Sequence, residues 1–275
     1  MKIINIVDDI KTGNSLNHEH GLSFYIENNS AKYLFDTGAS KNFLHNSKSL
    51  GIDIKDIDAL FISHNHYDHI GGLQHFMDIN EKAKIYIKED AIYKTFYNIV
   101  EVNYPVGKFH KEIPLSDRIV FVKDNIEVGQ IYLMSDIIGN KNNFCQGKSF
   151  YIKKDDEIVK DEFTHEMFVV HIKDEKANII SACSHRGIIN IIETVKTKFN
   201  LSINYVIAGF HLSAKGGSSI NCSPEYFKVL VEYFKSNNLK NLYTCHCTGK
   251  YAYSKLTEEL DGNINYFNMG DEINI

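Results

Sequence analysis

The segment from residue 63 to residue 72 reads Ser-His-Asn-His-Tyr-Asp-His-Ile-Gly-Gly and places four potential metal ligands within six residues. These ligands are His64, His66, Asp68 and His69. The segment directly follows the apolar run Ala59–Ile62, which predicts a buried strand. Imidazole and carboxylate groups bind zinc and similar divalent ions, so a strand that ends in this turn predicts a metal centre at a sheet edge. A solvated histidine-rich turn is the alternative, but the regular spacing and the Gly-Gly ending disfavour it.

The number of ligands predicts two ions. An ion that keeps one position open for water needs only three protein ligands, and four side chains this close exceed that number. His64 and His66 are two residues apart, so they can point the same way from an extended segment and bind a first ion. Asp68 and His69 follow directly and would begin a second site.

The composition restricts the classes of function. The chain has 275 residues, with 43% hydrophobic and 24% charged residues, which is typical of a water-soluble globular protein. Its net charge is −5 and it has no long basic block, so binding of nucleic acid is disfavoured. No apolar run is long enough to span a membrane, and the five cysteines lack the spacing of a disulfide framework, so we expect reduced thiols and a cytoplasmic location. The oligomeric state stays open.

Apolar runs and turn signals alternate along the whole chain, which predicts an α/β protein in which two sheets lie between helices, as a single domain over residues 1–275. Ser223 followed by Pro224 predicts a helix start, with serine as the N-cap. The predicted strands are 3–7, 22–26, 33–35, 59–62, 85–87, 119–122, 131–134, 150–152, 168–172, 179–182, 205–208 and 241–245. The predicted helices are 40–50, 73–77, 91–97, 188–199, 224–236 and 251–260. The region from about 100 to 165 has no familiar motif, and from its position we expect substrate contacts there.

Several further segments accompany the histidine motif in order along the chain, and together with it they resemble the metallo-β-lactamase superfamily. They are residues 19–23 (Glu-His-Gly-Leu-Ser), 33–38 (Tyr-Leu-Phe-Asp-Thr-Gly), 182–190 (Ala-Cys-Ser-His-Arg-Gly-Ile-Ile-Asn), 208–212 (Ala-Gly-Phe-His-Leu) and 245–249 (Cys-His-Cys-Thr-Gly). The combination is similar to a branch described as metal-dependent hydrolases, which includes the archaeal dihydropterin–ribofuranosylaminobenzene-phosphate synthases. The resemblance covers nearly the whole chain and implies an αββα four-layer sandwich.

The resemblance also implies the remaining metal ligands. His246, which follows a predicted strand, matches the late histidine of the family and would complete the second site. The middle of the family pattern is altered, because Cys183-Ser184-His185 stands where an aspartate is expected. His185 is therefore the predicted sixth ligand, after His64, His66, Asp68, His69 and His246. Cys183 is the main alternative, since a thiolate also binds zinc, and His165 with Glu166 is a further one.

Other residues are expected near the metals. His211 resembles a non-ligand histidine of related phosphoesterases, which implies proton transfer or binding of an anionic oxygen, with a structural role as the alternative. Asp36 is expected to accept a hydrogen bond from a metal-binding histidine. Glu19 and His20 would border the pocket. The segment Lys215–Ser219 could hold a phosphate, although an ordinary turn is the better interpretation.

The expected function is metal-assisted hydrolysis of a small anionic substrate, with a phosphoester as the expected class. Two divalent ions are expected, zinc first and iron or manganese as alternatives. Asp68 would orient the nucleophile between them, as the first of two catalytic residues with His211. The first alternative is a synthase that joins a dihydropterin to an aminobenzene ribosyl phosphate and releases pyrophosphate. A di-iron redox enzyme is disfavoured because His66 stands where those relatives carry glutamate, and a non-catalytic binding module is disfavoured by the intact metal motif.

Overall fold

The computed structural model describes residues 1–13, 15–99, 102–107, 116–139, 150–154, 156–213 and 218–275. The chain divides into two compact units. Unit 1 comprises Met1–Lys123, Lys148–Met167 and Asn268–Ile275, and unit 2 comprises Asp124–Gly147 and Phe168–Phe267. The prediction of a single domain stays a prediction.

Unit 1 contains a seven-stranded mixed sheet in the order β18-β1-β2-β3-β4-β5-β8. β1, β2, β3 and β18 pair antiparallel, whereas β3, β4, β5 and β8 run parallel, and Leu60 and Ile62 of β4 are fully buried. The helices α1 and α3 pack on the sheet through Phe43, Leu73 and Phe76, which share one buried core with its strands. The strands are β1 (Lys2–Val7), β2 (Ser23–Asn28), β3 (Ala31–Phe35), β4 (Ala59–Ile62), β5 (Lys84–Lys88), β8 (Ile119–Val122) and β18 (Glu272–Asn274), and the helical segments are α1 (Asn42–Ser49), η1 (Ile54–Asp56), α2 (Tyr67–Ile70), α3 (Leu73–Ile79) and η2 (Glu89–Ile92).

A second sheet of unit 1 has four strands in the order β12-β11-β6-β7. They are β6 (Lys94–Ile99), β7 (Val102–Pro105), β11 (Phe150–Lys154) and β12 (Glu157–Lys160). The predicted helix 91–97 was wrong, because most of it forms β6. Thr95 and Phe96 pair with Ile152 and Tyr151 of β11, and β-branched and aromatic residues favour such pairing when a partner strand is present.

Unit 2 contains a seven-stranded sheet in the order β17-β16-β15-β14-β13-β10-β9. β14, β15, β16 and β17 run parallel. The helices α5, α6 and α7 share a buried core with this sheet, in which Ile191, Leu230 and Leu256 are fully buried. The strands are β9 (Ile126–Val128), β10 (Ile131–Met134), β13 (Phe168–Lys173), β14 (Lys176–Ile180), β15 (Ser202–Ala208), β16 (Asn241–Thr244) and β17 (Asn265–Tyr266), and the helical segments are α5 (Ile188–Phe199), α6 (Pro224–Ser236), η3 (His246–Thr248) and α7 (Lys250–Glu259).

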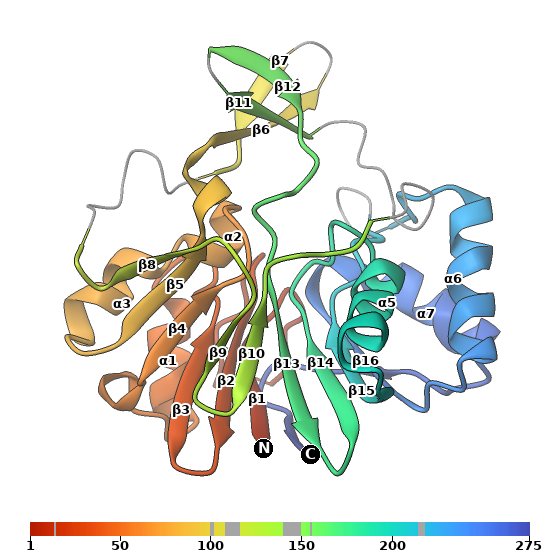
Figure 1. Cartoon of the computed structure of the whole chain (residues 1–275), viewed down its shortest axis with the longest axis horizontal. Coiled ribbons are helices and arrows are strands. Elements are labelled where there is room, and N and C mark those ends of the chain that lie inside the picture. Colours follow the sequence, from red (N-terminus) through yellow and green to blue (C-terminus); the bar gives the residue numbers. More distant parts are fainter. Residues whose placement is uncertain (14, 100–101, 108–115, 140–149, 155, 214–217) are drawn as a thin grey trace. The chain divides into compact units, whose positions relative to one another are not determined.

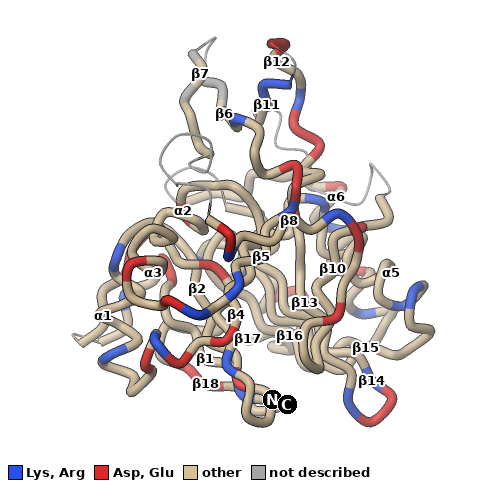
Figure 2. The backbone as a smooth tube through the Cα atoms, turned by 60° about the vertical axis from the view of Figure 1, so that its left-hand side comes forward, with Lys and Arg blue, Asp and Glu red and all other residues tan. Residues whose placement is uncertain are grey.

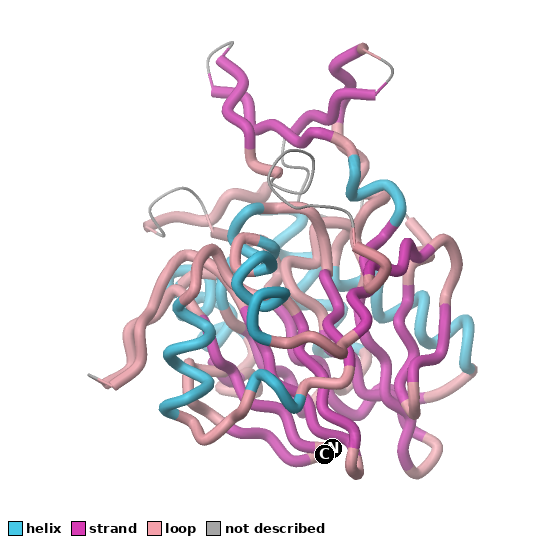
Figure 3. Tube along the Cα trace, turned by 90° about the vertical axis from the view of Figure 1, so that its left-hand side faces the viewer, coloured by secondary structure: helices cyan, strands magenta, loops and turns pink. Residues whose placement is uncertain are grey.

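The predicted α/β class is confirmed, and the remaining predicted elements form close to their expected places (Figure 3). The predicted cap is present, since the side chain of Ser223 accepts a hydrogen bond from the backbone N–H of Tyr226 at 3.1 Å. In the part of the chain that the structure describes, no helix is both long enough and apolar enough to cross a membrane.

Candidate metal centre

The histidine motif lies where parallel strands of unit 1 end. β3 and β4 are parallel neighbours, so Asp36 after β3 and Ser63-His64 after β4 emerge at the same sheet edge. His66 follows as the residue before α2, and Asp68 and His69 lie within that helix. All four predicted ligands of this segment are buried, with exposed fractions of 0% for His64 and His69, 5% for His66 and 7% for Asp68. A buried cluster of titratable groups at a strand end is typical of a functional site rather than of a hydrophobic core.

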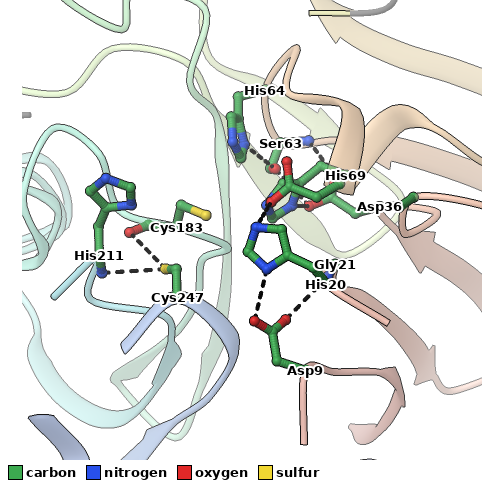
Figure 4. A network of polar contacts seen from close by, with 12 residues as sticks. Asp9, His20, Gly21, Asp36, Ser63, His64, His69, Cys183, His211 and Cys247 are labelled. Carbon is green, nitrogen blue, oxygen red and sulfur yellow. Dashed lines mark hydrogen bonds and ion pairs between the residues drawn. The ribbon is translucent and has the colours of Figure 1, made fainter. Parts of the chain in front are cut away.

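The carboxylate of Asp36 organises this cluster through three hydrogen bonds (Figure 4). It accepts hydrogen bonds from the backbone N–H of Ser63 at 2.7 Å, from the hydroxyl of Ser63 at 2.6 Å and from Nδ1 of His69 at 2.7 Å. The predicted role of Asp36, as acceptor from a metal-binding histidine, therefore has the predicted geometry. The carbonyl of His69 is held as well, since it accepts from the backbone N–H of Thr37 at 2.7 Å.

These hydrogen bonds also determine which imidazole nitrogens remain for a metal. The hydroxyl proton of Ser63 goes to Asp36, so Nδ1–H of His64, 2.8 Å from the Ser63 oxygen, is the donor of that pair. His69 likewise uses Nδ1, so both rings present Nε2 as the ligand nitrogen. The ring centroid of His64 lies 4.1 Å from that of His69 and 4.6 Å from that of His66.

The pKa values of the three histidines in this cluster are shifted in different directions. Burial lowers the pKa of His64 well below its usual value, and burial lowers the pKa of His66 to about 3, so both rings are neutral at neutral pH. Burial also acts to lower the pKa of His69, but the carboxylates of Asp68 and Asp36 outweigh it and raise that pKa to about 9. The metal-free centre therefore carries a proton on His69 at neutral pH.

This proton gives a testable prediction. A metal ion binds only neutral imidazole, so binding at pH 7.5 should release about one proton from His69, and metal affinity should rise with pH up to about 9. Calorimetric titration in buffers of different ionisation enthalpy measures the released protons. The Asp36→Asn variant is the control, because loss of that carboxylate lowers the pKa of His69 and should reduce the release. Equal proton release in both proteins would contradict this account.

His165, an alternative ligand, has hydrogen bonds at both nitrogens. Its Nε2 lies 3.1 Å from Oδ2 of Asp161, and its Nδ1 accepts from the backbone N–H of Asn65 at 3.4 Å. Burial raises the pKa of Asp161, but the neighbouring His165 and the Phe163 N–H outweigh it and lower that pKa overall. In this arrangement His165 therefore holds the backbone of Asn65, which lies between His64 and His66. Glu166 is also buried, and its role as an alternative ligand stays a prediction.

His20 reaches the cluster from the solvent side, as predicted for a residue that borders the pocket. Its Nδ1 lies 2.8 Å from Oδ2 of Asp9, and its Nε2 lies 3.4 Å from Oδ2 of Asp68 (Figure 4). Glu19, by contrast, accepts hydrogen bonds from the backbone N–H groups of Ala39 and Ser40 at 2.9 and 3.2 Å, so its carboxylate fixes the turn before α1.

The region from about 100 to 165, which has no familiar motif, contacts His66 within unit 1. The ring of Phe150, at the start of β11, stacks on His66 with centroids 5.1 Å apart and an interplanar angle of 15°. His66 also forms a β-bridge with Gly107. A Cβ at Gly107 would lie 2.2 Å from Oγ1 of Thr95, so only glycine allows the loop to approach this closely.

Unit 2 presents its own cluster after the carboxyl ends of β14, β15 and β16. Cys183 and His185 follow β14, His211 follows β15, and His246 and Cys247 follow β16. The rings of His185 and His211 have centroids 4.1 Å apart. Cys183, His185, His246 and Cys247 are buried. Cys247 was not among the predicted ligands, and its place beside His246 in the segment 245–249 is the sequence signal that points to it.

The donor set of unit 1 fits a divalent metal. Nδ1–H of His64 and Nδ1–H of His69 already have acceptors in Ser63 and Asp36, as in metal-binding histidines generally, and the rings of His64 and His69 lie side by side with centroids 4.1 Å apart. Since His64, His66, Asp68 and His69 lie in unit 1 whereas His185 and His246 lie in unit 2, convergence of all six on one centre stays a prediction. The segment Lys215–Ser219 falls mostly outside the described residues.

Comparisons with known proteins agree with this geometry. The family model described as the metallo-beta-lactamase superfamily matches residues 17–130, which include the whole histidine motif. The crystal structure of Tm1679, described as a metal-dependent hydrolase of the beta-lactamase superfamily, is similar over 100% of this chain and 99% of its own, with 29% identity and a TM-score of 0.81. The chain is similar to the metallo-β-lactamase superfamily in both sequence and fold. This similarity agrees with a mixed α/β fold in which histidine-bearing turns follow the strands.

Two curated relatives come from Methanocaldococcus jannaschii. The uncharacterised protein MJ0448 is 29% identical over 261 residues, covering 94% of each chain. A protein named 7,8-dihydropterin-6-methyl-4-(beta-D-ribofuranosyl)-aminobenzene-5'-phosphate synthase is 29% identical over 287 residues, covering 98% of this chain and 95% of its own. The two relatives are therefore one protein described as uncharacterised and one named synthase.

Proposed function

We propose that this protein is a metal-dependent hydrolase that acts on a small anionic substrate, most readily a phosphoester. One observation supports the proposal above the others: His64, His66, Asp68 and His69 form one buried cluster, in which Ser63 directs Nδ1–H of His64 and Asp36 directs Nδ1–H of His69. Such a cluster is costly to bury without a bound cation, so a metal-binding role explains its presence. Zinc is the first candidate, and two ions are the expected number.

A divalent cation held by these residues would lower the pKa of a bound water and polarise an anionic substrate oxygen. Asp68 is the residue of this chain that we assign to orienting the attacking water. Its carboxylate lies 3.5 Å from Nε2 of His69 and 3.4 Å from Nε2 of His20. Asp68 therefore lies between the buried His69 and the exposed His20. Asp9 holds His20 in this position.

The preference for an anion rests on the cluster rather than on a basic surface. Lysine residues do occur on β6 and β11, and acidic residues occur on β12 and on the turn before it (Figure 2). Lys153, for example, pairs with Asp156 at 2.6 Å, and the ammonium of Lys154 lies 5.6 Å from the ring centroid of Tyr93. This mixed pattern suits a small substrate better than a polyanion.

A synthase is the second candidate, favoured by the named relative that matches 98% of this chain. That reaction would join a dihydropterin pyrophosphate to an aminobenzene ribosyl phosphate and release pyrophosphate. The metal cluster serves either reaction, because both place negative charge on phosphate oxygens in the transition state.

One experiment separates the two candidates. The metal-reconstituted protein is incubated with a panel of phosphomonoesters and phosphodiesters, and separately with the dihydropterin pyrophosphate and the aminobenzene ribosyl phosphate. Release of phosphate or alcohol from an ester supports the hydrolase, whereas pyrophosphate release that requires both synthase substrates supports the synthase. Absence of both activities in a protein that has bound metal would refute the proposed function.

A further inference from the structure

We propose that Cys183, Cys247 and His211 of unit 2 form a sulfur-rich metal site. One ligand atom from each of these residues lies within 4.8 Å of the other two. Two thiolates and one imidazole favour zinc and other thiophilic divalent ions over magnesium or calcium. The site differs from the histidine cluster of unit 1 in both its residues and its donor chemistry.

The spacing of the donors suits tetrahedral zinc. Zinc–sulfur distances of about 2.3 Å and zinc–nitrogen distances of about 2.0–2.1 Å place tetrahedral donors roughly 3.5–3.8 Å apart. Donors that already lie within 4.8 Å of one another would close on an ion by small side-chain movements. The fourth position would be open to water or substrate, as at catalytic zinc sites generally.

The backbone is arranged around the sulfur of Cys247. The backbone N–H of His211 points to this sulfur at 3.3 Å, and the sulfur lies 3.6 Å from the carbonyl oxygen of Cys183 (Figure 4). An N–H donor that faces a sulfur stabilises the thiolate form, which is the form that binds metal. The Cys183 carbonyl would lose its thiol donor when Cys247 binds an ion.

The loops that carry the donors are fixed to one another over long sequence separations. A Cβ at Gly209 would lie 2.6 Å from the sulfur of Cys247 and 2.7 Å from the carbonyl oxygen of Ala182, so the absence of a side chain at Gly209 is what allows the loops to meet. The backbone N–H of Phe210 donates to the hydroxyl of Thr248 at 2.8 Å, which ties the His211 loop to the Cys247 loop. The donors are therefore held in place before a ligand arrives, as tight sites require.

This assignment gives His211 a different role from the proton transfer expected from sequence. It also uses Cys183, the residue considered as an alternative to His185 in the histidine centre. The use of Cys183 can be measured, because sulfur ligation has a spectroscopic signature that imidazole and carboxylate ligation lack. The role of His211 can be measured through the effect of its replacement on metal binding.

The test uses the full chain, purified in reducing agent, stripped of metal with a chelator and reconstituted with Co²⁺ as a coloured substitute for zinc. We expect a sulfur-to-cobalt absorption band that falls to roughly half in Cys183→Ser and in Cys247→Ser. His211→Ala should shift the visible cobalt bands and weaken cobalt binding about tenfold or more. Cys222→Ser is the matched control, because this half-buried thiol of unit 2 lies outside the three-donor group, and it should leave the spectrum unchanged.

Three results would overturn the proposal: no sulfur-to-cobalt band, a band that is undiminished in Cys247→Ser, or a spectrum unchanged in His211→Ala. The second would show that Cys183 alone binds metal, and the third would favour proton transfer by His211. Zinc-edge X-ray absorption of the unaltered protein, which should show sulfur at about 2.3 Å from zinc, keeps the test decisive if a variant fails to fold. Failure here would leave the proposed hydrolase intact, since that function is measured by metal content and turnover in variants of His64, His66 and His69.

Discussion

Replacement of His66 by alanine is expected to remove most of the metal from the histidine cluster and to lower turnover by about a thousandfold. The reason is that burial lowers the pKa of His66 to about 3, so its buried ring is neutral at neutral pH and suited to bind an ion. Metal-ion catalysis supplies several kcal/mol of transition-state stabilisation, and each 1.4 kcal/mol is about tenfold in rate. Elemental analysis and steady-state kinetics on the same preparation measure the two effects together.

The matched control is His75→Ala, which removes an exposed histidine on α3 of the same unit. It should leave metal content and turnover unchanged. Full activity of His66→Ala, or loss of activity with undiminished metal, would show that His66 is not a ligand on which turnover depends.

Replacement of Asp36 by alanine is expected to lower both the stability of the protein and its affinity for metal. Three hydrogen bonds end on this fully buried carboxylate, two from Ser63 and one from His69. Removing one partner of a buried ion pair costs about 3–5 kcal/mol of the free energy of unfolding. Loss of the residue that orients a metal-binding histidine lowers metal affinity about 10- to 100-fold.

In the metal-free protein, the loss of stability caused by Asp36→Ala should be larger at low pH than at high pH. The pKa of His69 is raised from 6.5 to about 9, so the stabilisation from its charged form is fully present below pH 6.5 and is lost as the pH rises through about 9. Denaturant unfolding at pH 6 and at pH 9.5 should therefore show a larger difference between the unaltered protein and Asp36→Ala at the lower pH. A difference that is constant with pH would contradict the assigned His69–Asp36 ion pair. Asp53→Ala, at an exposed cap of the same unit, is a control for general loss of a carboxylate.

The sequence by itself determined the features that depend on neighbouring residues. The spacing of His64, His66, Asp68 and His69 after an apolar run predicted both β4 and the ligand-bearing turn, because a strand followed by a polar turn is a local pattern. Ser223 before Pro224 predicted the start of α6 for the same reason, since an N-cap acts within a single turn. The role of Asp36 also followed from sequence, through the resemblance to the family.

Only the tertiary structure decided the features that depend on distant partners. The residues of β6 were predicted to form a helix, and their pairing with β11, more than fifty residues away, makes them a strand. Glu19 was expected at the pocket, but its carboxylate is used by the turn before α1. The contact between His211 and Cys247 joins loops that are 36 residues apart, and the space that Gly209 leaves for it depends on how β15 and β16 pack side by side. Local patterns specify caps, turns and strand ends, whereas the distances between metal donors follow from packing, which no short segment of sequence contains.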